Sequence, residues 1–233
     1  MKIVAVIPVR KGSQRVRDKN LRPFSGTTLL DNKIQSLLKV PELDEIVVNT
    51  NSEAAIEIVD GEYVGTKVRA QRRDEYYASS QCSGSEFFKH LGEVTDTEVF
   101  VYAPCTSPFI RPETVSKCIQ LFRTGFSNGE CDCVSTVSDV KDFLWKDGAP
   151  LNYDPLHAPN SQDLPDIVAL NFGVTVVHKE VLVSRSNIIG LRPKFVKTSD
   201  VEAFDIDTQL DYFIAEQVHR AISEGRAIDN LLG

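Results

Sequence analysis

Long hydrophobic runs are missing from this sequence. No stretch of about 18 apolar residues occurs, so we expect no membrane-spanning helix. The apolar start, residues 1–8, lacks the small-residue cleavage site of a signal peptide. Cations follow it at once, namely Arg10, Lys11, Arg15, Arg17 and Lys19. We therefore interpret the start as a buried first strand.

A basic excess is also missing. The chain has 26 Lys and Arg against 33 Asp and Glu, which gives a formal net charge of −7. A general nucleic-acid binder needs a basic face to contact phosphates, so this balance argues against a nucleic-acid partner. It leaves room for a local basic pocket that binds a small phosphate compound.

Cysteines are few and odd in number. The chain has five, which does not suit a disulfide framework in a chain of 233 residues. Cys131-x-Cys133 lacks the usual zinc spacing and has no histidine nearby. We therefore expect reduced thiols, no cysteine-bound metal and a cytoplasmic location.

An alternation of apolar runs and helical patterns is what the sequence does contain. With 42% hydrophobic residues, the chain suits one domain over 1–233. The patterns predict strands over 2–7, 45–49, 99–102 and 133–137, and helices over 29–38, 52–59, 112–122 and 207–221. Such an order predicts a three-layer α/β/α fold with a mostly parallel sheet. Ligands of such sheets bind beyond the carboxyl ends of the strands.

One segment, residues 139–170, interrupts this alternation. Its first part is rich in Pro, Asp, Asn and Gly and carries scattered aromatic residues. A loop of this length inside a compact domain is usually functional or an interaction arm. We expect it to protrude from the domain.

The loop from Arg10 to Asn20 follows the first predicted strand and concentrates cations in an acidic chain. It is neither a Walker A sequence nor a Gly-x-Gly-x-x-Gly fingerprint. Gly12 allows close backbone approach, Ser13 supplies a hydroxyl, and Arg10 can bind two phosphate oxygens at once. The loop therefore predicts a phosphate site, although a solvated basic loop is the alternative.

This loop also resembles a known signature. Ile-Pro-x-Arg-x-x-Ser over residues 7–13, followed by Lys19-Asn20, is similar to the signature of the CMP–sugar-acid synthetases, closest to the acylneuraminate cytidylyltransferases. The resemblance implies an α/β nucleotidyltransferase that uses CTP and Mg²⁺. It implies that Arg10, Ser13, Lys19 and Asn20 bind the nucleotide. Gln14 replaces the family's usual lysine, and neighbouring Arg15 is a substitute for that charge.

Two looser matches follow in the family's order. Residues 73–83 resemble the Arg-Pro-x-x-Leu-Ala segment that helps to bind cytosine, which makes Arg73 and Ser83 nucleotide-binding candidates. Ser80 stands where the family usually has aspartate. Without the resemblance, Arg72 and Arg73 would be a surface pair. Residues 103–108 resemble a Pro-Thr-Ser-Pro turn with an inserted residue, and Ala103 replaces a common glutamine.

Asp205 and Asp207 lie two residues apart near the end of the chain. In an extended segment their side chains share one face, and two like charges so close favour a cation between them. Carboxylate oxygens suit Mg²⁺, which also bridges to phosphate. The alternative is that Asp207 caps the helix that follows. The resemblance implies that both aspartates are magnesium ligands.

The segment Ser161-Gln162-x-Leu164-Pro165, with the later Asn171, resembles a family region that binds the sugar acid. The resemblance implies that this region forms an arm reaching the other subunit of a homodimer. Gln162 and Asn171 become substrate-binding candidates. Ser161 replaces the family's arginine, so Lys146 is a candidate cation for the acceptor carboxylate.

The resulting hypothesis is transfer of CMP from CTP to the anomeric hydroxyl of a sialic acid-like sugar acid, with release of pyrophosphate. Arg10, Lys19 and Asp207 would be the catalytic residues, because such transfers depend on positioning and charge neutralisation. The alternatives are a CMP-ulosonate synthetase, an Asp-x-Asp glycosyltransferase and a non-catalytic nucleotide-binding homologue. Preference for CTP comes from the resemblance, and the acceptor stays open.

Overall fold

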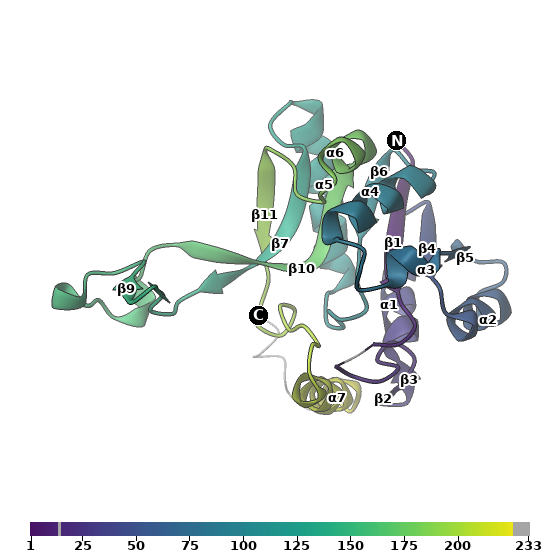
Figure 1. Ribbon diagram of the computed structural model, residues 1–233, viewed down its shortest axis with the longest axis horizontal. Helices are drawn as coiled ribbons and strands as arrows, with labels where there is room; N and C mark the ends of the chain where they lie inside the picture. The colour runs from purple at the N-terminus through teal and green to yellow at the C-terminus, as the bar shows by residue number, and fades with distance from the viewer. Residues whose placement is uncertain (14, 226–233) are drawn as a thin grey trace.

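A seven-stranded sheet forms the centre of the protein in the computed structural model, which describes residues 1–13 and 15–225 (Figure 1). The strand order is β11-β7-β10-β6-β1-β4-β5. Only β10 runs antiparallel to its neighbours β6 and β7, and the other pairs are parallel. The strands are β1 (Ile3–Val9), β4 (Glu45–Thr50), β5 (Val68–Arg72), β6 (Val99–Tyr102), β7 (Cys133–Val140), β10 (Ile167–His178) and β11 (Pro193–Lys197).

Helices cover both faces of the sheet. Side chains alternate across β1, so Ile3, Ala5 and Ile7 point to one core while Val4 and Val6 point to the other. The first core includes residues of α1 (Leu29–Leu38), α2 (Glu53–Glu62), α5 (Pro112–Ser127) and α7 (Gln209–Ser223). The second includes residues of α4 (Gly84–Val94) and α6 (Lys179–Arg185), and the short α3 (Glu75–Ala78) precedes α4. The predicted three-layer α/β/α fold is confirmed.

Most predicted elements lie where the sequence placed them, with small shifts at their ends. The largest shift is at the end of α5, which continues to Ser127 and does not stop at residue 122, while the last helix begins at Gln209 and not at Asp207. Thr208 is its N-cap and forms a capping box with Asp211, so the alternative that Asp207 caps this helix is wrong. Asp207 is left outside the helix with its carboxylate available for other partners.

An arm protrudes from the sheet at the ends of β7 and β10 (Figure 1). The outer ends of β7 and β10 pair from Val137–Leu170 out to Val140–Ile167 and lead into it. The segment between them holds the hairpin of β8 (Trp145–Lys146) and β9 (Ala149–Pro150) and two short 3₁₀ helices, Pro155–His157 and Ser161–Asp163. A second small hairpin, β2 (Pro23–Phe24) with β3 (Thr27–Thr28), precedes α1.

The five cysteines are all free. In the described part of the chain, no helix has the length and apolar character needed to cross a bilayer.

Candidate active site

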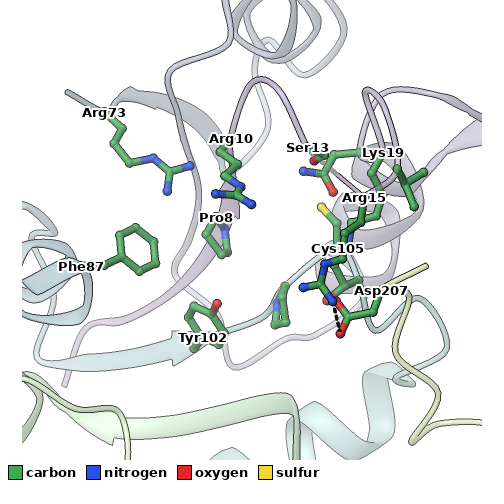
Figure 2. Close-up of a pocket in the computed structure, with 14 residues that line it drawn as sticks. Pro8, Arg10, Ser13, Arg15, Lys19, Arg73, Phe87, Tyr102, Cys105 and Asp207 are labelled. Atoms are coloured by element: carbon green, nitrogen blue, oxygen red, sulfur yellow. Dashed lines mark ion pairs between the residues drawn. The ribbon is translucent and has the colours of Figure 1, made fainter. Parts of the chain in front are cut away.

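A cleft opens beyond the carboxyl ends of β1 and β6, where the sheet topology predicts a ligand. The basic loop after β1 forms one wall, and the turn after β6 forms the floor. Figure 2 shows Arg73, Phe87 and Tyr102 on one side of Arg10, with Lys19, Arg15 and Asp207 on the other. The full lining is Pro8, Arg10, Ser13, Arg15, Val16, Lys19, Asn20, Arg73, Phe87, Tyr102, Pro104, Cys105, Thr106 and Asp207.

The basic loop is held in place at several points. Val16 is buried in the core, and the backbone of Lys11 donates to Asn51 Oδ1 at 2.8 Å. Gly12 has φ of 74°, in the left-handed region that glycine adopts easily. These anchors let the loop curve around the cleft, so that Arg10, Ser13, Lys19 and Asn20 all reach its lining. Gln14 lies outside the described residues.

Lys19 joins the loop to the acidic segment near the end of the chain. Its Nζ donates to the Ile206 carbonyl at 2.5 Å. Burial lowers the pKa of Lys19, while Asp205 and Asp207 oppose that shift. Arg15 Nη1 lies 3.0 Å from Asp207 Oδ2. Two segments far apart in sequence therefore form one charged arrangement, cations facing carboxylates.

Asp205 has a less favourable environment for its charge. Burial raises the pKa of Asp205, and Asp207 adds to the shift, while a hydrogen bond from Thr106 opposes it. The described residues contain no group of three or more His, Cys, Asp or Glu side chains that could bind a metal alone. Two carboxylates nevertheless suit a magnesium ion that takes its other oxygen ligands from a triphosphate and water. The residues present fit such an ion.

Arg73 is buried, with only 5% of its surface exposed, so the surface-pair alternative is wrong for it. Its Nη2 donates to the carbonyls of Val9 and Asn49, at the ends of β1 and β4. The guanidinium carbon lies 5.1 Å from the Phe87 ring centroid. Burial lowers the pKa of Arg73 to about 10, and Nε has no partner in the described structure. Arg73 therefore fixes the cleft wall by joining the ends of β1 and β4.

Ser83 lies in a second cavity that adjoins the cleft through Arg10, Arg73 and Phe87. Its hydroxyl is already used, since it donates to Glu86 Oε2 at 2.7 Å and accepts from the Glu86 amide at 3.2 Å. This capping box begins α4. A nucleotide contact in which Ser83 Oγ donates would have to replace the bond to Glu86, whereas a second lone pair of Oγ is still free to accept.

The three predicted acceptor-binding residues do not reach the cleft lining. Lys146 and Gln162 lie on the arm, in β8 and in the second 3₁₀ helix. Asn171 lies nearer, in a third cavity that it shares with Asp205. The structure thus brings the nucleotide and metal candidates together, and separates two of the three acceptor candidates from them.

Sequence reasoning missed several residues of the cleft. Phe87 and Tyr102 were not singled out, Thr106 was included only as part of the turn over residues 103–108, and Arg15 was considered only as a loop cation that substitutes for a lost lysine. A strand end is a usable signal for Tyr102 and Thr106, because β6 was predicted correctly and ligands of such sheets bind beyond the carboxyl ends of the strands. No local signal indicates Phe87, which reaches the cleft from the first turn of α4.

Comparisons with known proteins agree with this geometry. A family model described as "Cytidylyltransferase" matches residues 4–164. An N-acylneuraminate cytidylyltransferase of Escherichia coli is 32% identical over 127 residues, which are 53% of this chain and 29% of that enzyme. A CMP-N,N'-diacetyllegionaminic acid synthase of Legionella pneumophila is 26% identical over 231 residues, covering 94% of this chain and 96% of that enzyme.

A solved structure supports the fold. CMP:2-keto-3-deoxy-manno-octonic acid synthetase complexed with CTP superposes with a TM-score of 0.67 at 18% identity, covering 97% of this chain and 100% of that one. At this identity the likeness concerns the fold alone. The family model extends from β1 into the arm, and the curated relatives match the family indicated by the first motif. The chain belongs to the cytidylyltransferase family, among the CMP–sugar-acid synthetases.

Proposed function

We propose that the protein transfers CMP from CTP to the anomeric hydroxyl of a sialic acid-like sugar acid, with Mg²⁺, and releases pyrophosphate. One observation carries the proposal. A single cleft gathers Arg10, Ser13, Lys19 and Asn20 from the loop after β1 and places Asp207 opposite them. Cations that bind a triphosphate thus face a carboxylate that suits its metal ion.

The loop residues would position the nucleotide. Arg10 can bind two phosphate oxygens at once, and Lys19 acts as a point charge. Lys19 is already oriented by its bond to the Ile206 carbonyl, so little side-chain freedom is lost on binding. Ser13 and Asn20 add polar groups on the same wall. Together they would hold the α-phosphorus in line with the acceptor hydroxyl.

Asp205 and Asp207 would hold the magnesium ion beside these phosphates. When bound, Mg²⁺ would neutralise charge on the phosphoryl oxygens and so favour attack of the acceptor hydroxyl on the α-phosphorus. Asp207 pairs with Arg15 at the cleft lining, which holds the carboxylate toward the cleft. The ion pair of Asp207 and Arg15 therefore combines a carboxylate oxygen that suits Mg²⁺ with a guanidinium that can turn to a phosphate group.

The chemistry is one displacement. The acceptor oxygen forms a bond to the α-phosphorus, the bond from that phosphorus to the bridging oxygen breaks, and pyrophosphate leaves with the electron pair. The hydroxyl proton goes to solvent. All four histidines lie in the described part of the chain and none lines the cleft, so positioning and charge dominate over a histidine base.

The finer assignments rest on the resemblance and on the relatives. Arg73 and the cavity that contains Ser83 are candidates for the cytosine site, which would give preference for CTP. Lys146 and Gln162 would serve an acceptor only if the arm reaches a second subunit, so we propose a homodimer. Exposed apolar side chains on the arm, including Trp145 and Leu156, support that assembly. The free cysteines support a cytoplasmic location.

The test is product analysis. The protein is incubated with Mg²⁺, N-acetylneuraminic acid and each of the four nucleoside triphosphates, and pyrophosphate and nucleoside diphosphate are both measured. We expect pyrophosphate with CTP and only when the sugar acid is present. Nucleoside diphosphate as the product would indicate a glycosyltransferase, and nucleotide binding with no product from a panel of sugar acids would indicate a non-catalytic homologue.

A further inference from the structure

A mostly apolar cavity adjoins the cleft and includes Asp205. It shares Tyr102, Pro104 and Thr106 with the cleft, so an acceptor beside the α-phosphate would extend into it. The other lining residues are Phe88, Ser107, Asn171, Phe172 and Asp205. Phe88 and Tyr102 pack edge to face at 5.6 Å. No lysine, arginine or histidine of the described chain lines this cavity.

Phe172 enters this cavity from a strained backbone. Its φ is 51°, in the left-handed region that a bulky side chain rarely adopts. It lies in a bulge of β10, since Leu170 pairs with Val137 and Thr175 with Ser135, so that β10 advances five residues while β7 advances two. Bulges next to active sites often redirect a side chain, and such strain tends to persist where it has a function.

The side chain of Asn171, next to Phe172, forms hydrogen bonds that stabilise this bulge. Asn171 Nδ2 donates to Ser138 Oγ at 3.0 Å and to Thr198 Oγ1 at 2.9 Å. Asn171 Oδ1 accepts from Thr136 Oγ1 at 2.6 Å and from the Gly173 amide at 3.2 Å. Both N–H groups of the Asn171 side-chain amide are therefore already used. Asn171 has a structural role here, and no N–H of its side chain is left to donate to the sugar acid.

Gly173 fixes the other side of Phe172. A Cβ at Gly173 would lie 2.5 Å from Ile110 Cδ1 and 2.8 Å from Ile110 Cγ1, so a larger residue would require either the Ile110 side chain or the bulge to shift. The backbone on both sides of Phe172 is thus tightly set. Phe172 itself remains 40% exposed, with its ring against the cavity and not in the core.

We infer that Phe172 is a specificity-determining residue that contacts the acylamino group of the acceptor. The inference rests on the proposed function and deepens it. An apolar wall without a cation does not suit the carboxylate of the sugar acid. A hydroxyl group of the sugar acid would gain little binding free energy from such a wall. A methyl group at the end of an acylamino substituent would be buried against Phe172, Phe88 and Tyr102.

The test compares two acceptors that differ at one position: N-acetylneuraminic acid and its analogue with a hydroxyl in place of the acetamido group. The variant is Phe172→Asn, because asparagine tolerates a left-handed backbone and the fold is kept. We expect the ratio of kcat/KM for the two acceptors to fall about tenfold, with the KM for CTP unchanged. We also expect Tm to rise by about 2–4 °C as strain is relieved.

Ser186→Gly is the matched control. Ser186 has φ of 52° at the end of α6 and lies outside the cavity, so the variant relieves similar strain with no effect on the acceptor ratio. If Phe172→Asn retains turnover and the ratio of kcat/KM for the two acceptors is unchanged, the inference about Phe172 is overturned and the proposed function is not. A change confined to oligomeric state would assign Phe172 to a protein interface and overturn it as well. Absence of pyrophosphate release by the wild-type protein with any sugar acid would instead reject the proposed function.

Discussion

Asp207 is the residue on which the charge balance of the cleft depends. It lies in a segment that Lys19 binds through the Ile206 carbonyl, and it pairs directly with Arg15. A bound triphosphate would compete for these cations and leave Asp207 and Asp205 to a metal ion. The same side chains thus compensate one another before binding and, under the proposed function, would bind the substrate complex afterwards.

We predict that Asp207→Asn lowers kcat about 100-fold, because the amide keeps the shape but removes a charged oxygen ligand. Magnesium-dependent pyrophosphate release from CTP is the measurement. Asp60→Asn, at an exposed position on α2, is the control and should retain full turnover. Near-normal turnover in Asp207→Asn would show that the metal assignment is wrong.

Lys33 is a buried cation behind the cleft floor. It is 2% exposed on α1, and its Nζ donates to the Ser107 carbonyl at 2.7 Å, in the turn after β6. Burial lowers the pKa of Lys33 to about 8 from 10.5. Between these values the unfolded chain binds more protons than the folded one, so stability rises with pH through this window.

We predict that Lys33→Met removes this pH dependence. The free energy of unfolding of the wild type relative to the variant should increase by about 2 kcal/mol between pH 7 and pH 10. Urea unfolding of both proteins at the two pH values measures the difference. A constant difference would mean that Lys33 keeps an ordinary pKa in the folded protein.

At the residue scale, the sequence predicted which residues belong to the site better than it predicted the contacts that these residues make. Arg10, Ser13 and Lys19 were identified because they lie in one basic loop, and Asn20 was identified through the resemblance of that loop to a known signature. The burial of Arg73 could not be read locally, because its partners Val9 and Asn49 come from two other strands. The roles of these residues in nucleotide binding stay predictions.

At the scale of elements, the start of α7 links the fold to the acidic pair. Thr208 Oγ1 accepts from the Asp211 amide, and Asp211 Oδ2 accepts from the amides of Thr208 and Asp207. The capping box therefore also holds the backbone of Asp207. The stability of the start of α7 and the position of Asp207, a candidate metal ligand, therefore depend on the same turn.

We predict that Thr208→Ala lowers the free energy of unfolding by about 1 kcal/mol, the usual cost of losing an N-cap. Chemical denaturation measures it. Thr208→Ser keeps the hydroxyl and should retain most of the stability. Equal losses in both variants would indicate that the methyl group, and not the cap, stabilises this end of α7.

Several elements with a regular pattern were predicted well, while edge and irregular elements were missed, and so was the regular helix α4. The helix over Leu29–Leu38 and the strand over Val99–Tyr102 were predicted with the observed bounds. The strands β5 and β11 were missed because each contains two cations among five residues and lies at a sheet edge. The antiparallel β10 was missed because its bulge interrupts the alternation.

At the scale of the whole molecule, the arm is the feature whose apolar side chains are not covered by the rest of the described chain. Leu156 is 87% exposed, and Phe143, Trp145 and Leu151 are exposed beside it. Such a group of apolar side chains is typical of a contact surface. The alternation of strands and helices predicted the three layers, but no sequence pattern gave the direction of the arm, which β7 and β10 determine together.

We predict that the protein is a dimer and that Trp145→Ser with Leu156→Ser shifts it to monomer, because apolar contact area on the arm is lost. Sedimentation velocity over a range of concentrations measures the shift. Leu191→Ser, at a 73% exposed position on the body, is the control and should stay dimeric. A monomeric wild type would contradict the proposed assembly.

The central claim is the transfer of CMP, and the most direct measurement follows the α-phosphate itself. CTP labelled at the α-phosphorus is incubated with Mg²⁺, the protein and N-acetylneuraminic acid, and the products are separated. We predict that the label moves to a CMP–sugar conjugate with one pyrophosphate released for each transfer. Label that remains in CTP, or appears in CDP, across a panel of sugar acids would contradict the account.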